Sequence, residues 1–380
     1  MNIGYITSEY PHLNIYRSAG IGSFIYNISH SLRNKGCSIT VFVYGQKHSE
    51  VFYDEGVRIV MIEKKNYTLG GFYFYRKFIN TLISDKIKEY ELDLIEAADW
   101  TGVTAFMKFK IPLVVRLHGT DCFFCNLEGR KQKYKNFLLE NLALKNADTI
   151  VGVSNFVSTE TKRLFSIEKN VTSIHNFVNE SIVSLANNDL NVSYKYVLYF
   201  GSIIRKKGVL EISSIIKEVY DKDPSIKFIF IGSDVVDYKT KTSTVDLIKS
   251  KLSSNELKST KFLGKMSYQD TLSWVKNSDL VLLPSYAEAM PMTWIETMKL
   301  GKALIGSNIG WSKEIINHKV NGYSFSPKDS KGISKQILHL MENRETREYI
   351  ERNALKTAKE DFSEESLVQK NIDFYKSIIK

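Results

Sequence analysis

Short runs of β-branched and aromatic residues alternate with longer amphipathic stretches through the first half of the chain. Each run is bounded by turn-forming or polar residues, as strands are in βα units. We predict strands over 2–7, 38–44, 57–62, 92–97, 112–118, 148–154 and 171–176. The first half is therefore expected to form a parallel sheet covered by helices.

A second series of the same kind follows a polar segment over 177–195, which shows no clear period and is the best candidate for a linker. The final segment, SEESLVQKNIDFYKSIIK, carries apolar residues at about helical spacing and predicts a terminal helix with one buried face. Helices are also expected over 208–220 and 267–277. The strands predicted in this half are 196–202, 227–233, 260–265, 280–285, 302–307 and 321–326.

Together the two series predict an α/β protein with two doubly wound, Rossmann-like domains whose parallel sheets face a central cleft. We expect one domain over 1–185, a second over 195–362, and a C-terminal helix over 363–380 that packs back on the first domain. In open sheets of this class, ligands bind at the carboxyl ends of the strands. Gly264 and Pro284 fall at such ends.

Composition agrees with a soluble globular protein, because 43% of the 380 residues are hydrophobic and 25% are charged. No run is apolar for long enough to span a membrane, and the N-terminus has no basic segment followed by an apolar one. We therefore expect a cytoplasmic protein. The three cysteines cannot form a disulfide framework, which fits a reducing compartment.

The formal net charge is +10, and the lysine clusters are mixed with acidic residues along the chain. Solvated faces explain such clusters best, with attraction to an anionic membrane or a phosphorylated acceptor as the alternative. No nucleic-acid-binding module is visible, so no nucleic acid is expected as a partner. The aromatics of GGFYFYRKF, 70–78, either pack inside or dip into a membrane interface, and packing is favoured.

The stretch SYAEAMPMTWIETM, 285–298, places Glu288 and Glu296 eight positions apart around a helix start. Pro291 suits the first turn of that helix, because its missing N–H costs nothing there. Carboxylates can hold vicinal hydroxyls, and helix amides with nearby lysines can hold phosphates. A nucleotide sugar has hydroxyls at both ends and anionic charge between them, so it fits this constellation.

Two other loops are candidates for contact with an anionic ligand. Gly20 and Gly22 follow the first strand and precede a helix, although the dinucleotide fingerprint GxGxxG is incomplete and a plain tight turn explains them equally well. In the second half, Arg205 and Lys207 lie between a strand and a helix, where they could clamp a diphosphate. The alternative is that Arg205 and Lys207 are solvated and bind no ligand.

The chain resembles the retaining GT-B glycosyltransferases of family 4 over nearly its whole length. The matching stretches are AGIGSF, RLHGTD at 116–121, VGVSNFV at 151–157, IHNFVN at 174–179, FGSIIRKKG at 200–208 and the long run 284–315. The last contains the EX7E motif of the family, formed by Glu288 and Glu296, and is the most specific of them.

The resemblance implies a nucleotide-sugar donor held mainly by the second domain and an acceptor held by the first. Glu288 would lie beside the donor sugar, Glu296 would hold the ribose hydroxyls, and Lys207 would contact the diphosphate. His118 would face the donor sugar from the first domain. The other implied donor contacts are Gly20, Gly22, Gly264, Lys265, Met266, Ala289, Met290, Pro291 and Met292.

Two positions depart from the family pattern. An arginine usually follows the glycine of the second-domain loop, whereas this chain has Ser202, so Arg205 is expected to supply the charge. The loop after Glu288 reads Ala289-Met290-Pro291 instead of the commoner glycine-rich version, which affects its backbone fit to the donor.

The implied reaction moves a sugar from a UDP- or GDP-sugar to a hydroxyl of a glycan or lipid-linked acceptor, with retention, as in bacterial-type surface polysaccharide or glycolipid synthesis. No cofactor or metal is expected, since cations and helix amides would stabilise the leaving diphosphate. Alternatives are a non-catalytic nucleotide-sugar-binding protein, an epimerase or a phosphorylase. A metal site at His118, Cys122 and Cys125 lacks a convincing fourth ligand. The DKD at 221–223 is interpreted as a turn.

Overall fold

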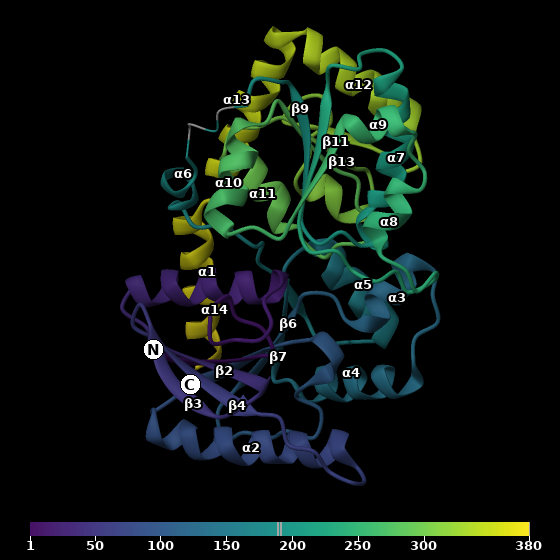
Figure 1. Cartoon of the computed structure of the whole chain (residues 1–380). Helices are drawn as coiled ribbons and strands as arrows, with labels where there is room; N and C mark the ends of the chain where they lie inside the picture. The colour runs from purple at the N-terminus through teal and green to yellow at the C-terminus, as the bar shows by residue number, and fades with distance from the viewer. Residues whose placement is uncertain (188–189, 191, 380) are drawn as a thin grey trace. The chain divides into compact units, whose positions relative to one another are not determined.

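The computed structural model describes residues 1–187, 190 and 192–379. The chain forms two compact units, one of Met1–Asn179 with Glu364–Lys380 and one of Glu180–Ser363 (Figure 1). The boundary after Asn179 lies inside the polar segment 177–195, of which residues 188–189 and 191 are outside the described part. Among the described residues, no helix is both long and apolar enough to cross a membrane.

The first unit is built on an eight-stranded sheet in the order β3-β4-β2-β1-β5-β6-β7-β8. All neighbouring strands are parallel except β3 and β4. The strand β3 was not predicted, because it lies at the sheet edge, is largely exposed and carries no buried apolar run. The strands are β1 (Asn2–Thr7), β2 (Ser38–Gln46), β3 (Glu50–Asp54), β4 (Val57–Glu63), β5 (Leu94–Ala98), β6 (Leu113–Leu117), β7 (Thr149–Gly152) and β8 (Val171–Ser173).

Helices cover both faces of this sheet. On one face, α1 and α14 share a core with β1, β2 and β4, and on the other Ile79 and Ile83 of α2 pack against the same strands. The predicted terminal helix is confirmed as α14, which buries Leu367, Val368 and Tyr375. The helices are α1 (Gly20–Asn34), α2 (Gly71–Glu89), α3 (Asp121–Glu128), α4 (Tyr134–Asn146), α5 (Asn155–Phe165) and α14 (Glu364–Ile378).

A buried ionic network joins α14 to this sheet. Arg116 of β6 donates to both carboxylate oxygens of Glu96 on β5 at 2.7 and 3.0 Å. The same guanidinium donates to Asn371 Oδ1 at 2.7 Å, and the Tyr375 hydroxyl donates to Glu96 at 2.9 Å. Arg116 and Glu96 are almost fully buried, so their charges depend on each other and on α14.

The second unit has a six-stranded, wholly parallel sheet in the order β11-β10-β9-β12-β13-β14. Its strands are β9 (Tyr196–Phe200), β10 (Lys227–Ile231), β11 (Thr260–Gly264), β12 (Leu280–Leu283), β13 (Leu304–Ser307) and β14 (Tyr323–Phe325). Its helices are α6 (Ile182–Leu185), α7 (Val209–Tyr220), α8 (Thr244–Lys249), α9 (Ser254–Lys258), α10 (Tyr268–Asn277), α11 (Met292–Lys299), α12 (Ser330–Glu342) and α13 (Arg344–Glu360). Because every strand pair in this sheet is parallel, the carboxyl ends of all its strands lie at one edge.

The prediction of two Rossmann-like α/β units is confirmed, with the antiparallel β3 as the addition. The DKD sequence at 221–223 is a turn between α7 and β10, as predicted. Asp223 Oδ1 accepts from the backbone N–H and the hydroxyl of Ser225 at 3.0 and 2.6 Å.

Candidate functional site

The loops after β9 and β12 are fastened to each other at the carboxyl edge of the second sheet. A short 3-10 turn, Arg205–Lys207, ends at Gly208, whose φ is +70°. A Cβ at Gly208 would lie 2.0 Å from the carbonyl oxygen of Pro284, so the backbones meet only because this residue is glycine. The N–H of Tyr286 donates to the carbonyl oxygen of Lys206 at 2.8 Å, which closes the junction.

This junction brings together two of the residues expected at the site. Lys207 Nζ lies 3.1 Å from Glu288 Oε1, and the Ser285 hydroxyl donates to the same oxygen at 3.0 Å. The two charged side chains are 20% and 12% exposed, so both retain access to solvent. The result is a partly open cation–carboxylate pair in front of α11.

Glu296 occupies a more closed position in the second turn of α11, where it is almost fully buried. The Tyr268 hydroxyl, at the start of α10, donates to Glu296 Oε1 at 2.8 Å. Burial raises the pKa of Glu296 to about 7, although the Tyr268 hydrogen bond and the charge of Lys207 act in the opposite direction. The helix begins at Met292, and Pro291 is its N-cap. Pro291 was predicted to lie in the first turn and therefore lies one position earlier than predicted.

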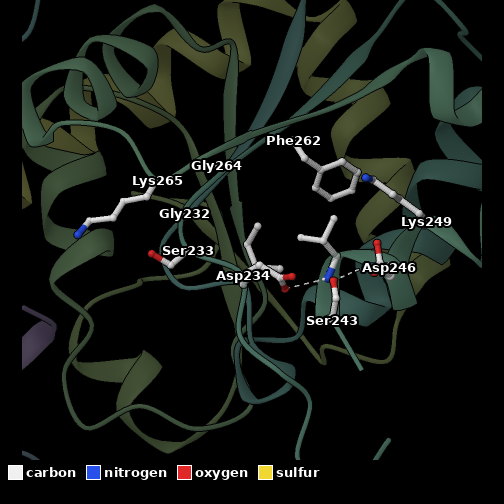
Figure 2. Close-up of a pocket in the computed structure, with 11 residues that line it drawn as sticks. Gly232, Ser233, Asp234, Ser243, Asp246, Lys249, Phe262, Gly264 and Lys265 are labelled. Carbon is white, nitrogen blue, oxygen red and sulfur yellow. Dashed lines mark hydrogen bonds between the residues drawn. The ribbon is translucent and has the colours of Figure 1, made fainter. Parts of the chain in front are cut away.

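A pocket of about 430 Å³ opens at the same sheet edge, between the ends of β10 and β11 and the helix α8 (Figure 2). Its floor includes Gly232, where a Cβ would lie 1.9 Å from the carbonyl oxygen of Gly201. Asp234 Oδ1 accepts from the N–H of Val245 at 3.1 Å and so holds the start of α8 against the β10 end. The pocket is lined by Ile203, Gly232, Ser233, Asp234, Ser243, Val245, Asp246, Lys249, Phe262, Gly264 and Lys265.

One wall of the pocket is aromatic and cationic. Phe262 stacks on Phe230 with ring centroids 4.8 Å apart, and Lys249 Nζ lies 5.4 Å from the Phe262 ring centroid. Figure 2 shows Lys265 on the opposite side from Lys249. Of the three residues expected around a nucleobase, Gly264 and Lys265 line this pocket, and Met266 is not among its lining residues.

Arg205 is held by a partner that sequence reasoning missed. Its Nε and Nη2 donate to the two carboxylate oxygens of Asp237 at 2.7 and 2.9 Å. Hydrogen bonding from Arg205 holds the pKa of Asp237 well below its usual range. Ser202, at the position where an arginine was expected, is exposed. An isolated Asp between Val236 and Tyr238 gives no sequence signal for this pair.

In the first unit, His118 directly follows β6 and is half-buried against Phe24 of α1, with ring centroids 4.8 Å apart. Burial, followed by the charge of Arg116, lowers the pKa of His118 to about 3, so the imidazole is neutral at physiological pH. Asp99 accepts from the backbone N–H groups of His118 and Gly119 at 3.0 and 3.1 Å. Burial raises the pKa of Asp99 to about 8. Sequence reasoning missed Asp99, although an acid just after a strand end was a usable signal.

Gly20 and Gly22 begin α1, as the sequence predicted for a glycine loop that leads into a helix. Gly22 lies close to Glu9, since a Cβ there would be 3.1 Å from that of Glu9, and its N–H donates to Glu9 Oε2 at 3.3 Å. Gly20 is exposed, and a Cβ added to it would meet no atom within 4 Å.

Cys122 and Cys125 lie on α3, where the Cys125 thiol contacts Asp121 at 3.6 Å. Within the described ranges, no group of three or more His, Cys, Asp and Glu side chains is arranged to hold a metal ion. In the second unit, Lys207, Glu288 and Glu296 and the pocket follow strand ends at one edge of the sheet, and in the first unit His118 follows β6.

The two units match separate family models. Residues 184–357 match the model described as Glycosyl transferases group 1, and residues 18–182 match the one described as Glycosyltransferase Family 4. A relative from Campylobacter jejuni, the N,N'-diacetylbacillosaminyl-diphospho-undecaprenol alpha-1,3-N-acetylgalactosaminyltransferase, is 23% identical, and the match covers 100% of both chains.

Solved structures give the same fold. Sucrose-phosphate synthase from Thermosynechococcus elongatus superposes with a TM-score of 0.81 at 16% identity, covering 99% of this chain and 98% of that one. HepE of Anabaena in complex with UDP-glucose superposes with a TM-score of 0.75 at 18% identity, covering 99% of this chain and 100% of that one. The fold is GT-B, and the family matches support a GT-B glycosyltransferase.

Proposed function

We propose that this GT-B glycosyltransferase moves a sugar from a nucleoside diphosphate sugar, with UDP or GDP as the carrier, to a hydroxyl of a glycan or lipid-linked acceptor. The observation that carries the proposal is the contact between Lys207 and Glu288 at 3.1 Å, beside Glu296 and the pocket at one sheet edge. A cation and two carboxylates there match the diphosphate and the two hydroxyl-bearing ends of such a donor.

The proposed donor orientation follows from the side chains. The base enters the pocket near Phe262, with Gly264, Lys265 and Met266 at its border, and the ribose hydroxyls donate to Glu296. The diphosphate lies near Lys207 and Arg205, and the sugar lies at Glu288. The remaining proposed donor contacts are Gly20, Gly22, Ser202, Ala289, Met290, Pro291 and Met292, and His118 is proposed to act on the donor sugar; these rest on the resemblance.

In the proposed mechanism, the bond between the anomeric carbon and the diphosphate oxygen breaks as the acceptor oxygen attacks on the same face. Lys207 and the amides before α11 stabilise the charge that develops on the leaving diphosphate, which does not require a metal ion. The leaving phosphate accepts the acceptor's proton, so no covalent glycosyl-enzyme forms. The sugar is therefore transferred with retention of the anomeric configuration.

The acceptor and the cellular role are proposed from the relatives. The Campylobacter jejuni relative is named for transfer to a diphospho-undecaprenol acceptor, and a 22% identical Staphylococcus aureus relative is named for capsular polysaccharide biosynthesis. We place this protein in bacterial-type surface polysaccharide or glycolipid synthesis, in the cytoplasm, with peripheral contact at an anionic membrane. A non-catalytic binding role is not favoured, because both glutamates and Lys207 are present.

A thermal-stability screen with UDP, GDP, ADP, dTDP and CMP tests the donor assignment. A ligand that binds only the folded protein raises Tm. At a hundredfold excess of ligand over Kd, the free energy of unfolding increases by about 2.7 kcal/mol. We expect one nucleoside diphosphate to raise Tm and EDTA to leave the shift unchanged. The absence of a shift with every nucleotide would contradict the donor assignment.

Tyr268→Phe should move the pH dependence of donor affinity upward. Ribose hydroxyls bind the ionised Glu296 better, so affinity should fall as pH drops through the Glu296 pKa of about 7. Because the Tyr268 hydrogen bond lowers that pKa, its loss raises the pKa and shifts the fall to higher pH. The measurement is donor Kd by calorimetry on both sides of pH 7.

Tyr349→Phe, at an exposed tyrosine of the same unit, is the matched control and should leave the pH profile in place. An unchanged profile in Tyr268→Phe would show that Glu296 does not contact the donor in its ionised form.

A further inference from the structure

Three segments of the first unit carry basic residues without any acid of their own. They are 64–78, 106–110 and 130–138, which together hold ten lysines and arginines and no aspartate or glutamate. Neighbouring segments neutralise some of this charge, since Lys65 pairs with Glu63, and Arg130 pairs with Asp121 and Glu128. The lysines at 64, 77, 108, 110, 131, 133 and 135 are all exposed.

The three segments meet in space. Lys135 Nζ, in the first turn of α4, lies 4.3 Å from the ring centroid of Phe72, in the first turn of α2. The Tyr73 ring lies 5.2 Å from that of Phe106. Asn80 of α2 both accepts from the N–H of Lys108 and donates to its carbonyl oxygen, at 3.2 and 3.1 Å. They therefore form one surface, which we call the basic aromatic surface.

Large apolar side chains stand out from this surface among the lysines. Leu69, in the loop before α2, is 84% exposed, Phe74 is 50% exposed and Tyr134 is 74% exposed. Phe74 contacts Tyr67 and Tyr73 with ring centroids 5.7 and 5.4 Å apart. We predicted from the sequence that the aromatics of 70–78 pack inside. That prediction is wrong for residues 72–74, because they are exposed and precede the part of α2 that faces the sheet.

The conformation of α2 and the loop before it keeps Leu69 and Phe74 exposed. The middle of α2 is anchored by Ile79 and Ile83, which are buried against the sheet. Gly70, with a φ of +65°, turns the chain into the helix, and a Cβ at this position would lie 3.0 Å from the Phe74 ring. The loop and the first helical turn thus project from an anchored helix, with α2 lying along the outside of its sheet in Figure 1.

We propose that the basic aromatic surface docks on an anionic phospholipid bilayer. Lysines at the edge of a bilayer are attracted to acidic headgroups, and aromatic and leucine side chains gain by entering the interfacial layer. A soluble polyanion would match the lysines alone and would leave Leu69 and Phe74 in water. The excess of exposed lysines and the protruding apolar side chains both fit a lipid surface.

Docking through this surface brings the first unit to the lipid layer, where a lipid-linked acceptor would be found. That consequence rests on the proposed function, whereas docking itself does not. Binding to vesicles is therefore measured without donor or acceptor, so its failure and the failure of transfer are separate results.

The test is flotation of the full-length protein with vesicles of phosphatidylcholine, with and without phosphatidylglycerol, at low and high salt. We expect binding to the anionic vesicles at low salt and a weaker partition at high salt, because surface charges are screened beyond about 10 Å at 0.1 M salt. Lys131→Gln, Lys133→Gln and Lys135→Gln combined should weaken the partition by about 100-fold, at roughly 1 kcal/mol for each lysine.

The matched control combines Lys328→Gln, Lys331→Gln and Lys335→Gln, three exposed lysines of the second unit that give the same change in net charge. It should partition like the unmodified protein. Leu69→Ser with Phe74→Ser should remove the binding that persists at high salt, and Val320→Ser with Tyr349→Ser should not.

Three outcomes would overturn the proposal: no binding of the unmodified protein to anionic vesicles, equal losses in both lysine triples, or equal binding to neutral vesicles. Binding to soluble heparin with none to vesicles would assign the surface to a polyanion instead. Circular dichroism of each variant shows that lost binding is not lost folding, since every changed side chain is exposed.

Discussion

Lys207→Ala should lower kcat for sugar transfer by about 10²–10³-fold, the usual cost of removing one donor that stabilises transition-state charge. Lys207 Nζ is held 3.1 Å from Glu288 by the junction between Gly208 and Pro284, so its charge is positioned before the donor arrives. KM for the donor should change less than kcat, because the charge on the diphosphate grows as the glycosidic bond breaks. The measurement is initial-rate kinetics with the donor identified by the stability screen.

Glu288→Gln should lower kcat by a similar factor, since it removes the carboxylate that the proposal places at the donor sugar. The two residues are in contact, so the double variant should lose less than the product of the two single losses. Lys217→Ala, at an exposed lysine on α7, is the control and should retain normal turnover. Normal turnover in either single variant would exclude that residue from the reaction.

Arg116→Met should destabilise the first unit by about 3–5 kcal/mol, the usual cost of removing one member of a buried ion pair. The change leaves the Glu96 carboxylate almost fully buried, with the Tyr375 hydroxyl as its remaining donor in the network. The two units need not unfold together, so hydrogen exchange of first-unit peptides in urea is the suitable measurement.

Arg116→Met combined with Glu96→Met should recover much of the lost stability, because the unpaired charge is gone and both new side chains are apolar. Arg344→Met removes an exposed ion pair with Glu348 and should leave first-unit exchange unchanged. Equal exchange in Arg116→Met and the unmodified protein would mean that the buried pair contributes nothing to stability.

The periodicity of the sequence was sufficient to predict the parallel strands and the terminal helix, because most of these strands and the helix carry a buried apolar run of their own. It was insufficient for β3, whose side chains are mostly in solvent. The same limit applies to Phe72, Tyr73 and Phe74, since a run of aromatics has the same composition whether it lies inside or outside. Only the anchoring of α2 at Ile79 and Ile83 decides that they project.

Some residues of the candidate site could be predicted from the sequence, and their partners could not. Glu288 and Glu296 could be found because their spacing and the helix between them are local, and Lys207 because it follows a strand. The partners of the site residues come from elsewhere in the chain: Tyr268 lies 28 positions from Glu296, and Asp237 lies 32 positions from Arg205. Such pairings depend on how the strands are ordered in the sheet, which no local pattern specifies.

The first unit is discontinuous in sequence, with the whole of the second unit inserted between residue 179 and α14. During synthesis, Asn371 and Tyr375 leave the ribosome only after the whole second unit, whereas their partners Arg116 and Glu96 leave it before that unit. The second unit is complete before then and can fold by itself. Until then, one sheet face lacks the part of its cover that α14 supplies, and Arg116 lacks its Asn371 partner. The final assembly of the first unit therefore follows synthesis of the whole second unit.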